Sequence, residues 1–263
     1  YDNLSKYIRF QMTALPAFIL CYLGAAFFVI LGGIPFAPLV VLWINFLVQI
    51  PIAIALGFDK PLPGLMERKP RPLSQPVLTR RQWARMVFIG VLMAVGTLLL
   101  ETLYEPTNAA LAATMGFAVF SLYNIAIGLS NRSETESVFN RDIVADRRQL
   151  QLYGLSLLAT LAPTIIGFFQ RGLGLTPLTL EQWLLCAAFA FGLLLVDEVI
   201  KFFMRRSRRR AAQPAPVAAL TSTRLSPLIS SPYNCPAASH ANAMIPAAPV
   251  MLPTKVAAPV FGW

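Results

Sequence analysis

The chain has 263 residues, of which 56% are hydrophobic and 13% are charged, and its mean hydropathy is +0.61. Charged residues make up about a quarter of an average soluble domain, so this composition excludes an ordinary soluble protein and indicates a membrane protein. The net charge of +10 comes mostly from Lys and Arg in short loops and after the last apolar segment, which argues against nucleic acid as a partner. The three cysteines have no metal-binding or disulfide-framework spacing.

Six apolar runs follow one another along the chain, each close to the roughly 20 residues that cross a hydrocarbon core. They span approximately residues 10–31, 38–58, 84–103, 109–129, 150–169 and 180–203. The predicted fold class is therefore an all-α membrane protein, a six-helix transmembrane bundle. Residues 211–263 are rich in Ala, Pro and Ser and contain no spanning run, so we expect a membrane domain at 1–210 and a disordered tail at 211–263.

The loops predict the orientation of these helices. Residues 59–85 hold seven basic side chains against two acidic ones, and six more basic side chains lie at the end of the sixth run and just beyond it. The loops on the other side, at 32–35, 104–108 and 171–177, carry few charges. The positive-inside rule therefore predicts a multi-pass protein of the cell membrane with both termini in the cytoplasm.

Two amides in the second run are candidates for a binding site. Asn45 and Gln49 are four residues apart, so on a helix they project from one face. Pro51 lacks an N–H group and leaves the carbonyl of Leu47 without its helical partner. Amide and carbonyl oxygens in an apolar segment would suit a cation or a proton relay. The alternative is that the amides only join helices, as polar residues often do in membrane bundles.

Acidic residues in the apolar runs have simpler interpretations. Asp197 and Glu198 precede Lys201 by four and three residues, a spacing that predicts a structural ion pair on one helix face. Glu101 and Glu105 flank a predicted external hairpin, where we expect them to be solvated.

Two prolines and a tryptophan add local expectations. Pro16 and Pro163 interrupt the first and fifth runs, so each predicts a kink, and Pro163 would free the carbonyl of Ala159. Trp43 lies near the start of the second run, as an interfacial anchor does.

Sequence motifs then point to a family. LWIN occupies residues 42–45, ALGF residues 55–58 and MERKPR residues 66–71, while the chain opens with DNLSKYIRF at residues 2–10. This pattern resembles the fifth and sixth membrane helices and the following loop of P-type cation-transporting ATPases, in particular the calcium-pump-like group. The resemblance covers about residues 1–205 and implies a segment equivalent to the last six of ten helices. The implied partners are the lipid bilayer, a transported cation, and the ATPase head with the first four helices.

The sequence holds none of the family's catalytic motifs: no DKTGT phosphorylation loop, no TGES and no nucleotide-binding segment. The resemblance therefore implies that ATP and Mg belong to the head, and we expect no cofactor and no ATP hydrolysis in this chain by itself. The opening at Tyr1 is expected to continue a longer parent protein. Two functions remain open. One is the transport module of an ATP-driven cation pump, forming part of its ion pathway. The other is a headless, non-transporting bundle with a binding or regulatory role.

The family's ion ligands carry over position by position. Asn45 matches the family's sixth-helix Asn, Gln49 stands at its acidic position, and Asn124 stands at the eighth-helix Glu. The fifth-helix Asn and Glu fall at Leu15 and Phe18. The resemblance thus implies Asn45, Gln49 and Asn124 as ion-pathway candidates without a carboxylate. Such a set argues against Ca²⁺ and leaves a monovalent ion, a proton or a non-transporting remnant open.

Overall fold

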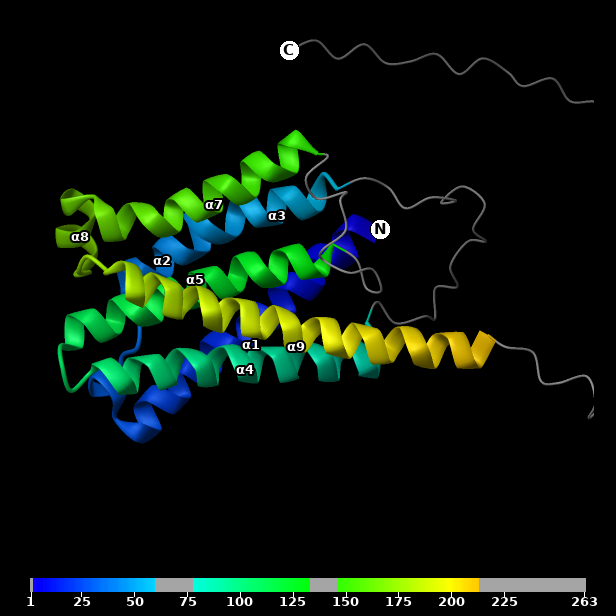
Figure 1. Cartoon of the computed structure of the whole chain (residues 1–263), viewed down its shortest axis with the longest axis horizontal. Helices are drawn as coiled ribbons and strands as arrows, with labels where there is room; N and C mark the ends of the chain where they lie inside the picture. The colour runs from blue at the N-terminus through cyan, green and yellow to red at the C-terminus, as the bar shows by residue number, and fades with distance from the viewer. Residues whose placement is uncertain (1, 60–77, 133–145, 213–263) are drawn as a thin grey trace, which may run out of the picture. The chain divides into compact units, whose positions relative to one another are not determined.

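A computed structural model describes the protein at residues 2–59, 78–132 and 146–212, with side chains described as far as residue 206. The predicted tail at 211–263 therefore lies almost wholly outside the described residues. Within the described part the secondary structure is helical, without strands (Figure 1). The elements are α1 (Asp2–Phe28), η1 (Ile30–Gly33), α2 (Pro38–Trp43), η2 (Ile44–Gln49), α3 (Ile50–Gly57), α4 (Arg80–Tyr104), α5 (Ala109–Asn131), α7 (Arg147–Ile165), α8 (Gly167–Leu173) and α9 (Leu180–Ala212).

The predicted bundle of membrane helices is confirmed. Five described segments are long and apolar enough to cross a membrane: α1, the continuous stretch Pro38–Gly57, α4, α5, and α9 as far as Arg206. A sixth is present if the bent pair α7 and α8 counts as one span. Helices dominate here because a chain in lipid must satisfy its own backbone groups.

The fifth run bends near Pro163, as predicted, but the bend breaks the helix into two instead of only kinking it. The helix α7 ends at Ile165, and α8 leaves it at an angle of 83°. Ile166 between them is extended, with φ −90° and ψ 113°, three residues after the helix-weakening Pro163. Phe169, predicted as the end of the fifth helix, therefore belongs to α8.

The helix α5 forms the centre of the bundle. It packs against α1, α4, α7 and α9 as well as η2 and α3, and Figure 1 shows it between these neighbours. Of its most apolar stretch, 72% is buried, whereas the other candidate spans bury between 22% and 50%. Side chains on α5 therefore face other helices on most sides.

Small residues let α1 and α4 approach closely. A Cβ atom at Gly90 of α4 would lie 3.1 Å from the carbonyl oxygen of Thr13 and 3.3 Å from the amide nitrogen of Ala17. The facing side of α1 also includes small buried side chains, namely Ala17 and Cys21. Close backbone packing through small residues is the usual way in which membrane helices associate.

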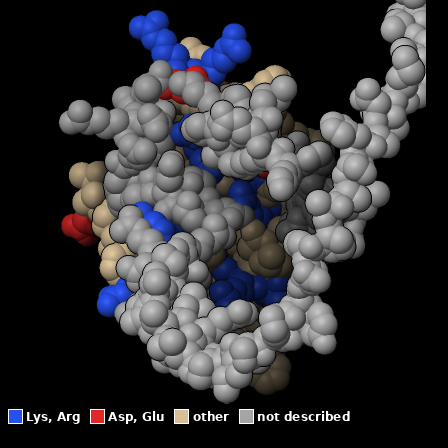
Figure 2. All heavy atoms as spheres, turned by 90° about the vertical axis from the view of Figure 1, so that its right-hand side faces the viewer, with Lys and Arg blue, Asp and Glu red and all other residues tan. Residues whose placement is uncertain are grey.

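The bundle has two chemically different ends. One end, here called the basic end, carries Lys6, Arg85, Arg132 and Lys201 and holds the start of α1 and the C-terminal part of α9 (Figure 1). Figure 2 views the molecule from that side, and blue Lys and Arg atoms gather there between the grey residues. The opposite end, here called the hairpin end, holds η1, the turn between α4 and α5, and α8.

Candidate functional site

The structure brings two of the three predicted site residues together. Gln49 in η2 is 4% exposed and Asn124 in α5 is fully buried. The Nε2 atom of Gln49 donates to the Oδ1 atom of Asn124 at 3.0 Å, and the Nδ2 atom of Asn124 donates to the carbonyl of Phe120 at 2.8 Å. This hydrogen-bonded amide pair joins the second span to the central helix.

The third predicted residue, Asn45, lies apart from the pair. It belongs to the first turn of η2, and its side chain is half-buried. The fully buried side chains of this segment are those of Ile44 and Val48, which belong to the hydrophobic core. No hydrogen bond of the described residues connects Asn45 to Gln49 or Asn124.

The amide pair sits where the second span changes its helical form. Residues Ile44–Gln49 form a π-helix that ends two residues before Pro51, the residue that lacks a backbone donor. Single-turn π-helices are often found at functional sites. The carbonyl that a neighbouring helix binds here is that of Val48, which accepts a hydrogen bond from Ser156 Oγ at 2.9 Å. The carbonyl predicted to lack its helical partner was that of Leu47, one residue earlier.

An aromatic cluster surrounds Phe18, the position at which the resemblance predicted that a family carboxylate is replaced. Phe18 lies 4.4 Å from Phe120 and 5.8 Å from Phe36, measured between ring centroids. Leu15, the other position carried over on the first span, is 49% exposed. The neighbourhood of the amide pair is therefore apolar and neutral. Among the described residues no group of three or more His, Cys, Asp or Glu side chains gathers as a metal site would need.

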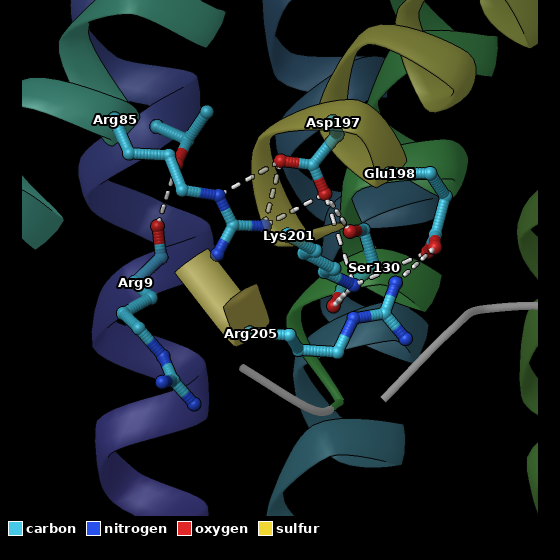
Figure 3. A network of polar contacts seen from close by, with 8 residues as sticks. Arg9, Arg85, Ser130, Asp197, Glu198, Lys201 and Arg205 are labelled. Atoms are coloured by element: carbon cyan, nitrogen blue, oxygen red, sulfur yellow. Dashed lines mark hydrogen bonds and ion pairs between the residues drawn. The ribbon is translucent and has the colours of Figure 1, made fainter. Parts of the chain in front are cut away.

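A second polar cluster lies at the basic end, around Asp197 of α9 (Figure 3). Arg85 of α4 donates to both carboxylate oxygens of Asp197, through Nε at 2.8 Å and Nη2 at 2.7 Å. Ser130 of α5 also donates to this carboxylate. Lys201, predicted as the partner of Asp197, lies 3.8 Å from it and donates to the Ser130 carbonyl at 2.7 Å. The cluster therefore connects α4, α5 and α9.

A cavity adjoins this cluster, and its lining argues against cation binding. Arg9 of α1 and Arg85 line it together with Asp197 and polar side chains such as Thr13. The carboxylate of Asp197 is already bound by Arg85, and two guanidinium groups against one carboxylate leave the lining with an excess of positive charge, which repels a cation. The amide pair is therefore the better candidate for an ion pathway.

A third cluster is centred on Asp59, two residues after the end of α3, and connects it with α1 and with the end of α5. Lys6 of α1 binds one of its carboxylate oxygens at 2.7 Å, and Arg132 after α5 binds the other at 2.8 Å. Burial by itself raises the pKa of Asp59, but the hydrogen bonds and positive charges of Arg132 and Lys6 outweigh it and lower the pKa below its ordinary value.

The expectation that Glu101 is solvated was wrong. Its side chain is fully buried in the last turn of α4, whereas Glu105 is half-buried and accepts the Leu31 N–H at 2.9 Å. The sequence did contain a signal for the burial. The buried side of α4 includes Gly90 and Thr97, and continuing at helical spacing reaches Glu101.

Comparison with known proteins identifies the family to which this chain is similar. The family model described as "Cation transporting ATPase, C-terminus" matches residues 33–203. "Calcium-transporting ATPase 1" of Yarrowia lipolytica is 28% identical over 207 residues, which cover 78% of this chain and 22% of that protein. "Calcium-transporting ATPase" of Bacillus subtilis is 34% identical over 145 residues, 54% of this chain and 16% of that protein. "Calcium-transporting ATPase type 2C member 2" of Mus musculus is 27% identical over 225 residues, which cover 83% of this chain and 23% of that protein.

These matches confirm the resemblance found in the sequence motifs. The chain spans about a fifth of the length of the relatives named above. The family model matches well over half of the chain and covers the amide pair, the π-helix and the Asp197 cluster. The protein therefore belongs to the family of cation-transporting ATPase C-terminal segments.

Proposed function

We propose that this chain is the membrane transport module of an ATP-driven cation pump and forms part of its ion pathway. The observation that carries the proposal is the buried hydrogen bond between Gln49 and Asn124, formed beside a π-helix. Two buried amides facing each other in an apolar bundle are costly to keep without a partner. Their pairing keeps each satisfied until a cargo replaces one of the bonds.

The chemistry of the pair favours a singly charged cargo, either a monovalent cation or a proton. Amide and backbone carbonyl oxygens can replace part of a hydration shell, but they bring no negative charge. A divalent ion in hydrocarbon needs charge compensation as well as oxygen ligands. Phe18 and the buried apolar side chains around the pair supply none. Asn45, half-buried one turn earlier, would be the next oxygen along the pathway.

The rest of the pump would supply the energy. ATP hydrolysis, with its Mg²⁺, belongs to a head that carries the phosphorylated Asp, and this chain does not hydrolyse ATP by itself. The π-helix and Pro51 make the second span the part of the bundle best suited to follow a change of state in that head. We place the protein in the cell membrane with the basic end toward the cytoplasm, in agreement with the positive-inside rule.

The test is cation uptake by membrane vesicles that contain the complete pump with a Gln49→Leu substitution. Uptake should be lost while thermal unfolding shows a folded protein. The matched control is Gln149→Leu, because Gln149 is equally buried and its Nε2 atom donates to the Ala55 carbonyl at 2.6 Å, away from the pair. This control should alter stability and leave uptake intact.

A second variant tests the charge argument. Gln49→Asp places a carboxylate beside Asn124 and should increase the binding of divalent ions relative to the unaltered protein. Normal uptake by the Gln49→Leu protein would reject the ion-pathway proposal. It would favour the alternative in which the amides only join helices in a non-transporting bundle.

A further inference from the structure

Glu101 is a buried acid that the proposed ion pathway does not use. Its side chain is fully buried, and neither carboxylate oxygen has a hydrogen-bond partner among the described residues. The carboxyl group lies directly against Gly116 of α5. A Cβ atom placed on Gly116 would come within 2.8 Å of Cδ and 2.9 Å of Cγ of Glu101. The glycine therefore provides the space that the carboxyl group occupies.

The surroundings of Glu101 disfavour a negative charge. Among the residues that the structure describes, the titratable groups that interact with it electrostatically are Cys21 and Tyr22 on α1 and Glu105 on its own helix, and none of these three is basic. The helix α5 presents Gly116, which has no side chain. Glu101 also lies in the last turn of α4, where the helix dipole repels an anion. Glu105, one turn further, adds a like charge at the i,i+4 spacing.

A metal ion fits this environment less well than a proton does. A hard cation needs several oxygen ligands arranged around it. The contacts described around Glu101 supply one carboxyl group and no second acidic ligand beyond Glu105, whose Oε1 atom accepts the Leu31 N–H. A proton needs a single carboxylate oxygen, and its binding removes the buried charge.

We propose that Glu101 is a proton-binding site near the hairpin end of the bundle, occupied at neutral pH and separate from the Gln49–Asn124 pair. Its ligand is the proton itself, held by a carboxyl group that Gly116 accommodates between α4 and α5. This site does not depend on the proposed transport function. A protonated carboxylic acid at this position would be present in a pump and in a non-transporting bundle alike.

The test is labelling with dicyclohexylcarbodiimide, an apolar reagent that adds a protonated carboxylic acid across its N=C bond. The protein is treated in its membrane at neutral pH, and the modified residues are identified by peptide mass spectrometry. Glu101 should be labelled, labelling should fall at alkaline pH, and Glu101→Gln should lose the modification. The control Glu105→Gln should retain the Glu101 label, because Glu105 is half-buried and bonded to η1.

Two results would overturn the proposal. One is labelling of Glu105 without labelling of Glu101 at neutral pH. The other is protection of Glu101 by Na⁺, K⁺ or Ca²⁺ at constant pH, which would show that a metal ion occupies the carboxyl group. Intact folding of Glu101→Gln is checked separately by thermal unfolding. If that variant fails to fold, the pH dependence of Glu101 labelling in the unaltered protein still tests the proposal.

Discussion

The Asp197 cluster allows a quantitative test of what holds α9 to the bundle. Substituting Asp197→Asn keeps the shape of the side chain and removes its charge. Arg85, whose side chain is 11% exposed, would then lose the anion that balances it, and Lys201, 1% exposed, would keep Glu198 as its ion-pair partner. Removing one partner of a buried ion pair destabilises a protein by about 3–5 kcal/mol. We expect a loss of that order in the free energy of unfolding.

Reversible unfolding of the protein in mixed micelles, followed by circular dichroism, would measure this loss. The matched control is Glu198→Gln, because Glu198 is more exposed than Asp197 and lies 3.6 Å from Lys201. The ion pairs of Glu198 with Lys201 and Arg205 are long, at 3.6 Å and 3.7 Å, whereas Arg85 binds both oxygens of Asp197, so we expect a smaller loss at Glu198 than at Asp197. A clear difference between the two variants is therefore expected.

A double substitution separates the charge effect from simple packing. Replacing Arg85 and Asp197 together by Leu removes both charges, and such apolar replacements of buried ion pairs are often neutral or stabilising. We therefore expect the double variant to recover much of the lost stability. The reasoning would be refuted if Asp197→Asn lost no more stability than the Glu198 control, or if the double variant were less stable than Asp197→Asn.

Three further results are expected. The lowered pKa of Asp59 means that its ion pairs stabilise the fold above the group's ordinary pKa of 3.8 and are lost as the pH falls; Asp59→Asn should remove this acid dependence from unfolding curves. Gly116→Ala should cost about 1–3 kcal/mol of stability through overpacking and much less when combined with Glu101→Ala, as a double-mutant cycle would measure. Trp43→Phe should cost about 1–3 kcal/mol in the same assay, because it leaves the Ala159 carbonyl without its donor.

The sequence predicted the helices well because hydropathy reports directly on membrane spans. A span must be long, apolar and internally hydrogen-bonded, so the runs at 38–58 and 109–129 match the observed span Pro38–Gly57 and helix Ala109–Asn131 closely. The same signal does not report helix geometry. The run at 150–169 also belongs to a stretch long and apolar enough to span, yet the chain turns by 83° after Ile165.

Predictions about individual polar groups depended on how the helices pack. Pro163 correctly predicted a carbonyl at Ala159 without its helical partner, but the donor that binds it, Trp43 Nε1 at 2.8 Å, comes from another span. Trp43 was predicted only as an interfacial anchor. Similarly, the burial of Glu101 depends on the space left by Gly116 on the next helix. Such contacts join residues far apart in sequence, so local patterns do not reveal them.

The position of the charges limits what this chain can contribute to a transport site. Among the described residues, the buried ion pairs of Asp59 and Asp197 lie at the basic end, and Glu101 lies near the hairpin end. The Gln49–Asn124 pair between them is neutral. Under the proposed transport function, a divalent cargo at this pair would need compensating carboxylates that the described residues around the pair do not supply. A singly charged cargo could be held by the amide oxygens with far less compensation, so the charge of the cargo decides whether this bundle can form the site from its own residues.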